Sequence, residues 1–159
     1  MTELQRRSLG PIAGSLALLL GALAFQYVGG LAPCPLCILQ RWPHGVAIAI
    51  GLVLLVWQRR WMALLAGVLV LGGAGVGVYH LGVESGWWPG PTTCTAPSPG
   101  TMAPGELLDQ ILATPVVLCD QVAWSLLGIS MAGWNAILSL GIVWLWWRAY
   151  ASSSASQYR

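Results

Sequence analysis

Long apolar stretches without charged residues dominate the chain and predict its secondary structure. Four such stretches can be marked along it, and they run Ser8 to Gln40, Trp42 to Gln58, Trp61 to Val83 and Gln121 to Trp147. Crossing a bilayer as a helix takes about 20 residues, with about 17 at the short end of the range. We therefore expect transmembrane helices at about 8–28, 43–58, 61–83 and 122–147, joined on one side by outer loops 29–42 and 84–121.

The second outer loop is the one long polar segment, and its prolines favour extended or turning chain. Within it, "PGELLDQIL" places Leu107, Leu108, Ile111 and Leu112 at helical spacing, with Glu106 and Asp109 on the other side. We expect a short amphipathic helix here, lying either on the membrane surface or on the bundle. The expected fold is an all-α membrane protein: one domain over residues 1–159, built as a four-transmembrane-helix bundle.

Composition supports a membrane environment. The chain is 57% hydrophobic and 8% charged, against roughly 25% charge in soluble domains. Every basic residue is an arginine, and six of the seven fall on one side of the expected bundle: Arg6, Arg7, Arg59, Arg60, Arg148 and Arg159. The positive-inside rule then places both termini in the cytoplasm and the outer loops in the periplasm or its equivalent. Topology accounts for the net charge of +2, so no nucleic-acid partner is indicated.

Four cysteines share the outer side: Cys34, Cys37, Cys94 and Cys119. That compartment permits disulfides. A four-cysteine zinc ribbon needs two CxxC pairs, and only one is present. A structural disulfide would suit Cys94 and Cys119, since closing their long loop is worth about 3 kcal/mol. It suits Cys34 and Cys37 poorly because so short a loop gains little stability, and such pairs more often exchange thiols.

The residues around the CxxC pair favour redox chemistry. Pro35 is well placed as a first helical residue, so free N–H groups would point at the Cys34 sulfur and stabilise its thiolate. Arg41 follows Cys37 by four residues, which puts both on one helical face with Cys34. We expect its guanidinium to lower the thiol pKa, the alternative being that Arg41 extends to the lipid headgroups. At Pro43 the second span either kinks or begins its main helix.

Three segments together resemble the bacterial disulfide bond formation protein B family, DsbB. They are "CPLCILQRWPH", "YHLGVESGWWPGPTTC" and "CDQVAWSLLGISMAGWN", and the resemblance covers nearly the whole chain. It implies a multi-pass protein of the bacterial inner membrane that acts as a protein-dithiol:quinone oxidoreductase. Such a thiol oxidase reoxidises a periplasmic thioredoxin-fold oxidant, DsbA-like, and passes the electrons to ubiquinone or menaquinone.

The resemblance also implies a role for each site residue. The partner's thiolate would attack Cys94 and free Cys119, which would attack Cys34 and release Cys37. Cys37, beside Arg41, would then donate electrons to the quinone. His80 and His44 would contact the quinone or carry protons. Two alternatives for the histidines are a hydrogen bond from His80 to Glu84, four residues on, and a bis-histidine haem site.

Two other functions stay open on the sequence alone. Vitamin K epoxide reductase-like proteins run similar exchange on a four-helix bundle, but their redox CxxC usually lies in the last pair of spans, whereas here it follows the first. A non-catalytic tetraspan scaffold with disulfide-stapled outer loops is the second. Rapid, reversible reduction of the Cys34–Cys37 pair by a quinol would exclude the scaffold.

Overall fold

The computed structural model describes residues 1–92, 94–95 and 117–155. Within these residues it has four helices, α1 (Glu3–Tyr27), α2 (Pro35–Trp57), α3 (Arg60–Glu84) and α5 (Met131–Ala155), and a two-stranded sheet of β1 (Ser125–Leu126) and β2 (Ile129–Ser130). Among the described residues, α1, α2 and α3 are long and apolar enough to cross a membrane. This agrees with the expected all-α membrane bundle. The amphipathic helix expected around residues 104–112 lies outside the described residues.

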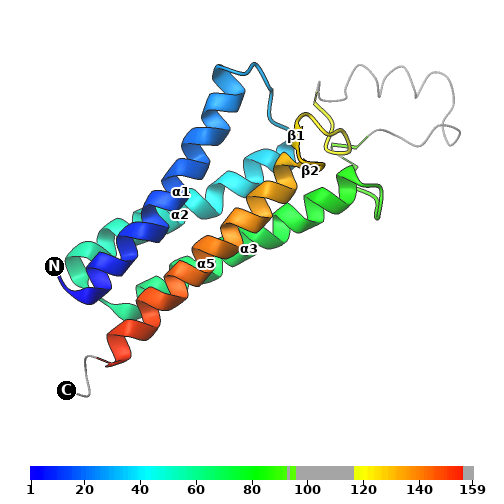
Figure 1. Cartoon of the computed structure of the whole chain (residues 1–159). Coiled ribbons are helices and arrows are strands. Elements are labelled where there is room, and N and C mark those ends of the chain that lie inside the picture. Colours follow the sequence, from blue (N-terminus) through cyan, green and yellow to red (C-terminus); the bar gives the residue numbers. More distant parts are fainter. Residues whose placement is uncertain (93, 96–116, 156–159) are drawn as a thin grey trace, which may run out of the picture.

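The four helices lie side by side in one elongated bundle (Figure 1). Helix α1 packs on α2 and α5, and α3 packs on the same two helices. The first turn of α1, the α2–α3 junction and the last turns of α5 lie at one end, and the hairpin lies at the other (Figure 1). Many apolar side chains remain exposed on the outside of the helices, such as Leu20 (55%), Leu52 (54%) and Val68 (57%). Such an apolar exterior suits lipid as the solvent.

Helix α1 begins at Glu3, earlier than the predicted boundary near residue 8. Thr2 and Gln5 form a capping box, in which each side chain bonds the other residue's backbone N–H. Glu3 in the first turn pairs with Arg6 at 2.8 Å and Arg7 at 2.5 Å. The span prediction counted only the charge-free stretch and therefore missed this charged but well-capped turn.

Helix α2 begins at Pro35 and runs through Pro43 to Trp57 without ending at the internal proline. It therefore starts a full two turns before the boundary at 43. Pro35 stands at the first helical position, where its missing N–H costs nothing. Pro43 packs against α3 at Gly73, where an added Cβ would lie 3.0 Å from the Pro43 Cβ. The glycine leaves room for the proline ring between the two helices.

Small residues place α3 between its two neighbours. Gly73 faces Pro43 of α2, and one turn later Gly77 faces α5, where an added Cβ would lie 3.2 Å from the Ala136 Cβ and 3.3 Å from the Ala132 oxygen. Close backbone approach of this kind is how helices associate in lipid, where the hydrophobic effect does not drive them together. The two glycines of the GxxxG spacing thus serve two helix interfaces, Gly73 that of α3 with α2 and Gly77 that of α3 with α5.

The last helix begins at Met131, later than the boundary predicted near residue 122. The residues before it form an antiparallel hairpin with Ser125 opposite Ser130. Leu127 and Gly128 make the turn, both with positive φ (54° and 76°), as a two-residue hairpin turn of the favoured hand requires. This stretch carries no charge, so the charge-free criterion counted it as part of the span.

Candidate functional site

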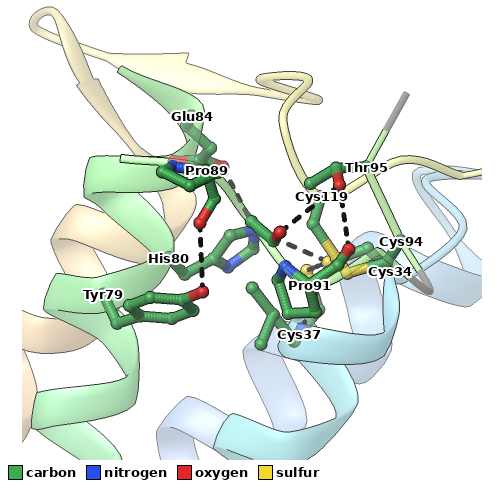
Figure 2. The surroundings of a disulfide bond; sticks show 12 residues. Cys34, Cys37, Tyr79, His80, Glu84, Pro89, Pro91, Cys94, Thr95 and Cys119 are labelled. Carbon is green, nitrogen blue, oxygen red and sulfur yellow. Dashed lines mark hydrogen bonds and ion pairs between the residues drawn. A yellow bond between two sulfur atoms is a disulfide. The ribbon is translucent and has the colours of Figure 1, made fainter. Parts of the chain in front are cut away.

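All four cysteines meet at the hairpin end of the bundle (Figure 2). Cys34, Cys94 and Cys119 are buried in a small apolar cluster with Leu36 and Val83, and Cys37 packs against it. Cys34 belongs to the first outer loop, whereas Cys94 and Cys119 belong to the second. The fold thus brings together two cysteine pairs that lie far apart in the sequence.

Cys94 and Cys119 form a disulfide. The Cys119 N–H also donates to the Cys94 carbonyl at 2.5 Å. The Cys94 and Cys119 side chains are 1% and 0% exposed. A partner protein therefore reaches this disulfide only if the residues that bury it move aside. The bond ties the start of the second outer loop to its end, which is what a structural staple also does.

Cys34 and Cys37 are free thiols with their sulfurs 2.9 Å apart. Cys34 is the N-cap of α2, and its sulfur accepts the Cys37 backbone N–H at 3.2 Å. The sequence prediction that helix N–H groups point at this sulfur is confirmed. Hydrogen bonds from the Cys37 thiol, from His80 and from that backbone N–H lower the pKa of Cys34 from 9.0 to about 4, against the opposing effect of burial. The thiolate of the reduced pair therefore sits on Cys34.

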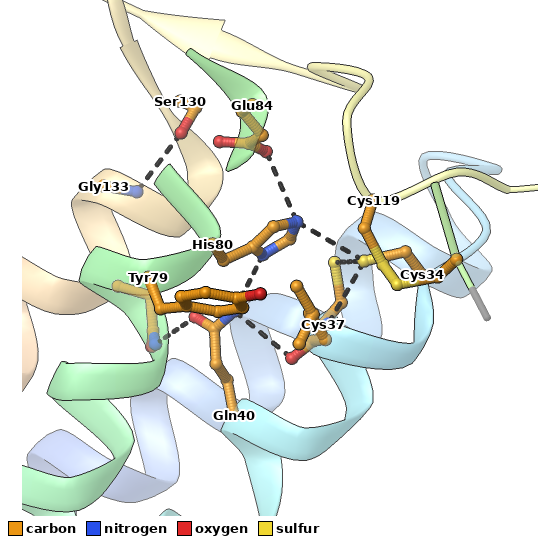
Figure 3. A network of polar contacts seen from close by, with 12 residues as sticks. Cys34, Cys37, Gln40, Tyr79, His80, Glu84, Cys119, Ser130 and Gly133 are labelled. Atoms are coloured by element: carbon orange, nitrogen blue, oxygen red, sulfur yellow. Dashed lines mark hydrogen bonds and ion pairs between the residues drawn. A yellow bond between two sulfur atoms is a disulfide. The ribbon is translucent and has the colours of Figure 1, made fainter. Parts of the chain in front are cut away.

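His80 of α3 links the thiols to a buried polar network (Figure 3). Its Nε2 atom lies 3.5 Å from the Cys34 sulfur and 3.8 Å from Oε1 of Glu84. Its Nδ1 atom lies 2.9 Å from Nε2 of Gln40. Glu84, the partner expected four residues on, lies within ion-pair distance but beyond hydrogen-bonding distance, and the contact with Cys34 is added to it. Oε2 of Glu84 is buried and has no hydrogen-bond partner among the described residues.

Arg41 makes its hydrogen bond to α1 rather than to the sulfurs that it was predicted to activate. Its Nη1 atom donates to Oε1 of Gln26 on α1 at 2.6 Å, and the groups that bond the Cys34 sulfur are Cys37 and His80. The side chain crosses toward α1, and the groups that lower the pKa of Cys34 are Cys37 and His80; the predicted effect of Arg41 on the thiol stays a prediction. Its Nε atom is buried, and within the described part of the chain it has no hydrogen-bond partner.

His44 is buried in the middle of the bundle and bridges two helices. Its Nδ1 atom lies 3.3 Å from the Ser15 hydroxyl of α1, and its Nε2 atom lies 3.2 Å from the Ser139 hydroxyl of α5. Both ring nitrogens of His80 also have side-chain contacts. A bis-histidine haem would need one nitrogen from each ring, so this packing disfavours the haem alternative.

A cavity of about 400 Å³ lies between the helices and reaches the CxxC pair. Apolar side chains from α1, α5 and the segment after Cys119 form much of its wall, among them Phe25 and Trp124, whose ring centres are 5.0 Å apart. Polar groups also line it, from α2 and its N-cap, from α3, from α5 and from the segment after Cys119, and they are Cys34, Cys37, Gln40, Arg41, His44, His80, Glu84, Gln121 and Asn135. Mostly apolar walls with a few convergent polar groups are typical of a small-molecule site.

Three possible metal ligands also lie close together here. The sulfurs of Cys34 and Cys37 and a ring nitrogen of His80 are within 4.8 Å of one another. The zinc alternative from the sequence needed all four cysteines, but Cys94 and Cys119 are bonded to each other. A Cys₂His set would be the ligand group instead.

Sequence reasoning missed several polar side chains that shape this site. Gln40 and Asn135 bond each other at 2.7 Å between α2 and α5, and Gln26, Ser15 and Ser139 hold Arg41 and His44. One signal was available. Uncharged polar residues inside apolar spans usually face the bundle interior, where they hydrogen-bond between helices.

Comparison with known proteins agrees with this geometry. The family model "Disulfide bond formation protein DsbB" matches residues 6–149. A Disulfide bond formation protein B of Dechloromonas aromatica (strain RCB) is 35% identical, with 82% of each chain covered. Another from Stutzerimonas stutzeri (strain A1501) is 32% identical over 88% of this chain and 93% of that protein. No solved structure gives a significant match.

Proposed function

Because the chain belongs to the DsbB family of disulfide bond formation proteins, we propose that it is a membrane thiol oxidase linked to quinone. It reoxidises a periplasmic thioredoxin-fold dithiol oxidant, DsbA-like, and passes the two electrons to ubiquinone or menaquinone. The balanced reaction converts the partner's dithiol and a quinone into the partner's disulfide and a quinol, so two electrons and two protons are transferred.

One observation carries this proposal: the two cysteine pairs lie in one buried cluster, and the CxxC pair also lines the cavity. Thiol–disulfide exchange needs the attacking sulfur to reach the disulfide it attacks. Electrons can therefore pass from one cysteine pair to the next and on to a molecule in the cavity. A scaffold with two structural disulfides would not need this adjacency.

The proposed sequence follows the exchange chemistry. The partner's thiolate attacks Cys94, which breaks the Cys94–Cys119 bond and frees Cys119. Cys119 then attacks Cys34 of the oxidised CxxC pair, forming a Cys34–Cys119 bond and releasing Cys37 as a thiolate. Cys37 is thus the free sulfur while Cys34 is bonded, whereas in the fully reduced pair the charge rests on Cys34.

The cavity is the proposed quinone site. Its apolar wall would take the lipid-soluble ring, and Arg41, His80 and His44 line it with hydrogen-bonding groups. The unpartnered Nε–H of Arg41 is a donor available for a quinone carbonyl. Arg41 therefore keeps its proposed quinone contact although it does not contact the sulfurs.

The proposed location is the bacterial inner membrane. Helix α5 is 25 residues long and packs along α1 and α3, so we infer that it crosses the bilayer with them. The arginine distribution supports cytoplasmic termini. The cysteine cluster, at the opposite end of the bundle, would then face the periplasm.

Quinone absorbance provides the test. Purified protein is mixed with a reduced thioredoxin-fold partner and with ubiquinone or menaquinone, and quinone reduction is followed. We expect stoichiometric oxidation of the partner with at least one quinone. Absence of turnover with both would overturn the oxidase and leave the scaffold. The vitamin K epoxide reductase-like alternative is disfavoured by the CxxC position before α2 rather than in the last helix pair.

A further inference from the structure

The orientation of one buried amide fixes what His80 can do. The side-chain nitrogen of Gln40 lies 3.3 Å from the Leu36 carbonyl and 2.9 Å from Nδ1 of His80. A carbonyl oxygen only accepts, so the Gln40 group facing Leu36 is the NH₂. The Gln40 oxygen, at the other end, accepts from Asn135 at 2.7 Å. Both ends of the amide are therefore assigned by their partners.

This assignment determines the tautomer of His80. The Gln40 NH₂ donates to Nδ1, so Nδ1 carries the lone pair and the neutral ring carries its proton on Nε2. Nε2 is the atom that lies 3.5 Å from the Cys34 sulfur and 3.8 Å from Glu84. Its N–H can donate to the Cys34 thiolate, and it offers no lone pair either to accept a thiol proton or to bind a metal.

We propose that Gln40, held by Asn135, is a positioning residue that keeps His80 as a hydrogen-bond donor to the Cys34 thiolate. The inference rests on the proposed function in that it concerns the same dithiol. It also explains how these three possible metal ligands can serve a redox site without binding a metal. The ring nitrogen nearest the sulfurs carries a proton and therefore has no lone pair for a metal ion. Stabilising the thiolate favours the reduced pair and makes the CxxC disulfide the stronger oxidant.

The direct test needs no variant of Gln40, no partner and no quinone. The chain has two histidines, so ¹⁵N-histidine-labelled reduced protein gives two ring spin systems, and His44→Gln identifies that of His80. We expect nitrogen shifts of the Nε2–H tautomer for His80. Shifts of the Nδ1–H tautomer, or a change in the His80 signals on adding Zn²⁺, would overturn the proposal while leaving the oxidase activity untouched.

A second test measures the consequence at sulfur. Gln40→Met keeps length and removes the NH₂, and Gln26→Met is the matched control because Gln26 bonds Arg41 rather than His80. We expect the rate of Cys34 alkylation in Gln40→Met to fall about tenfold at about pH 3, below the pKa of the thiol, and only about twofold at about pH 5, since losing a hydrogen bond to a charged group weakens ionisation about tenfold. The control should keep the wild-type rate. Equal rates in both variants, with both folded by circular dichroism, would contradict the proposal.

The pH profile of that rate separates positioning from a general structural role. The other titratable or charged groups near the cluster are Cys37 and Arg41 of α2, Glu84 of α3, and Asp120, which follows Cys119. None of them is changed by Gln40→Met. A profile displaced to higher pH with an unchanged plateau would show loss of thiolate stabilisation, whereas a uniformly lowered plateau would indicate only a damaged site and would count against the proposal.

Discussion

The Nε2 atom of His80 lies 3.5 Å from the sulfur of Cys34, although the two residues are 46 positions apart in the sequence. Cys34 caps the start of α2, and His80 stands one turn before the end of α3. The contact therefore exists only because these two helix ends meet at the same end of the bundle. Through His80, α3 thus contributes a hydrogen-bonding group to the thiol at the start of α2.

Thiol reactivity at Cys34 should persist to low pH. With a pKa of about 4 against 9.0 for an ordinary thiol, alkylation of Cys34 should stay fast at neutral pH and decline only as the pH falls through about 4. The associated stabilisation of the reduced protein is fully present above pH 9, because the unfolded thiol is then also ionised, and is lost as the pH falls to about 4. Site-resolved alkylation rates measured against pH check this.

Removing the imidazole should move that profile. His80→Leu deletes a donor to the thiolate, so the pKa of Cys34 should rise, and the alkylation rate should fall about tenfold at about pH 3 and only about twofold at about pH 5. His44→Leu is the control because the hydrogen bonds of His44 to Ser15 and Ser139 do not involve Cys34. An identical shift in both variants would mean that burial, not the hydrogen bond, controls the thiol.

Substituting Cys37 should stop electron transfer to quinone. Cys37→Ser leaves Cys34 without its CxxC partner, so no quinone reduction with a dithiol partner is expected. The Cys34 thiolate should instead attack Cys119 of the Cys94–Cys119 disulfide, which releases Cys94 as a thiolate and leaves Cys34 bonded to Cys119. Non-reducing electrophoresis and mass spectrometry detect that species. Turnover that survives Cys37→Ser would refute the proposed electron path.

Arg41 should matter for the quinone and not for the thiol. Arg41→Met removes the cavity donor and should raise the KM for quinone about tenfold or more, with the pH profile of Cys34 unchanged. Arg59→Met is the matched control, since Arg59 caps α3 at the far end of the bundle. Steady-state kinetics with varied quinone separate the two variants. A shifted Cys34 profile in Arg41→Met would restore the role that the sequence suggested.

The end of α3 should be sensitive to a single methyl group. An added Cβ at Gly82 would lie 2.0 Å from the ring of Trp88, which donates its N–H to the Tyr79 carbonyl at 2.9 Å. Gly82→Ala should therefore destabilise the protein by about 1–3 kcal/mol. At Gly75 nothing lies within 4 Å of an added Cβ, so Gly75→Ala should be neutral or stabilising. Thermal unfolding in detergent compares the two, and equal melting temperatures would contradict the packing.

The membrane orientation has its own test. A fluorescent protein that matures only in the cytoplasm, fused after Arg159, should be fluorescent, and the same protein inserted at the hairpin turn beside Leu127 should not. The arginine distribution predicts this result. Fluorescence from the hairpin fusion alone would reverse the topology and place the cysteines in a reducing compartment.

The sequence by itself determined the class of the protein and the position of its cysteines at one end of the helices. Charge-free length reports the solvent around each segment, so helical spans could be placed before any contact was known. The CxxC spacing and Pro35 also sufficed to predict a helix N-terminus directed at Cys34, because those interactions span only three residues.

Only the tertiary structure decided which side chains meet across helices. Sequence spacing put Arg41 on the face of the sulfurs, yet its long side chain bonds Gln26 of α1, and His80 takes the place beside Cys34. The hairpin before α5 was also hidden, since an uncharged turn has the same composition as a span. Helix rotation, close approach at glycines and the choice among hydrogen-bond partners depend on distant residues, so spacing within one segment cannot specify them.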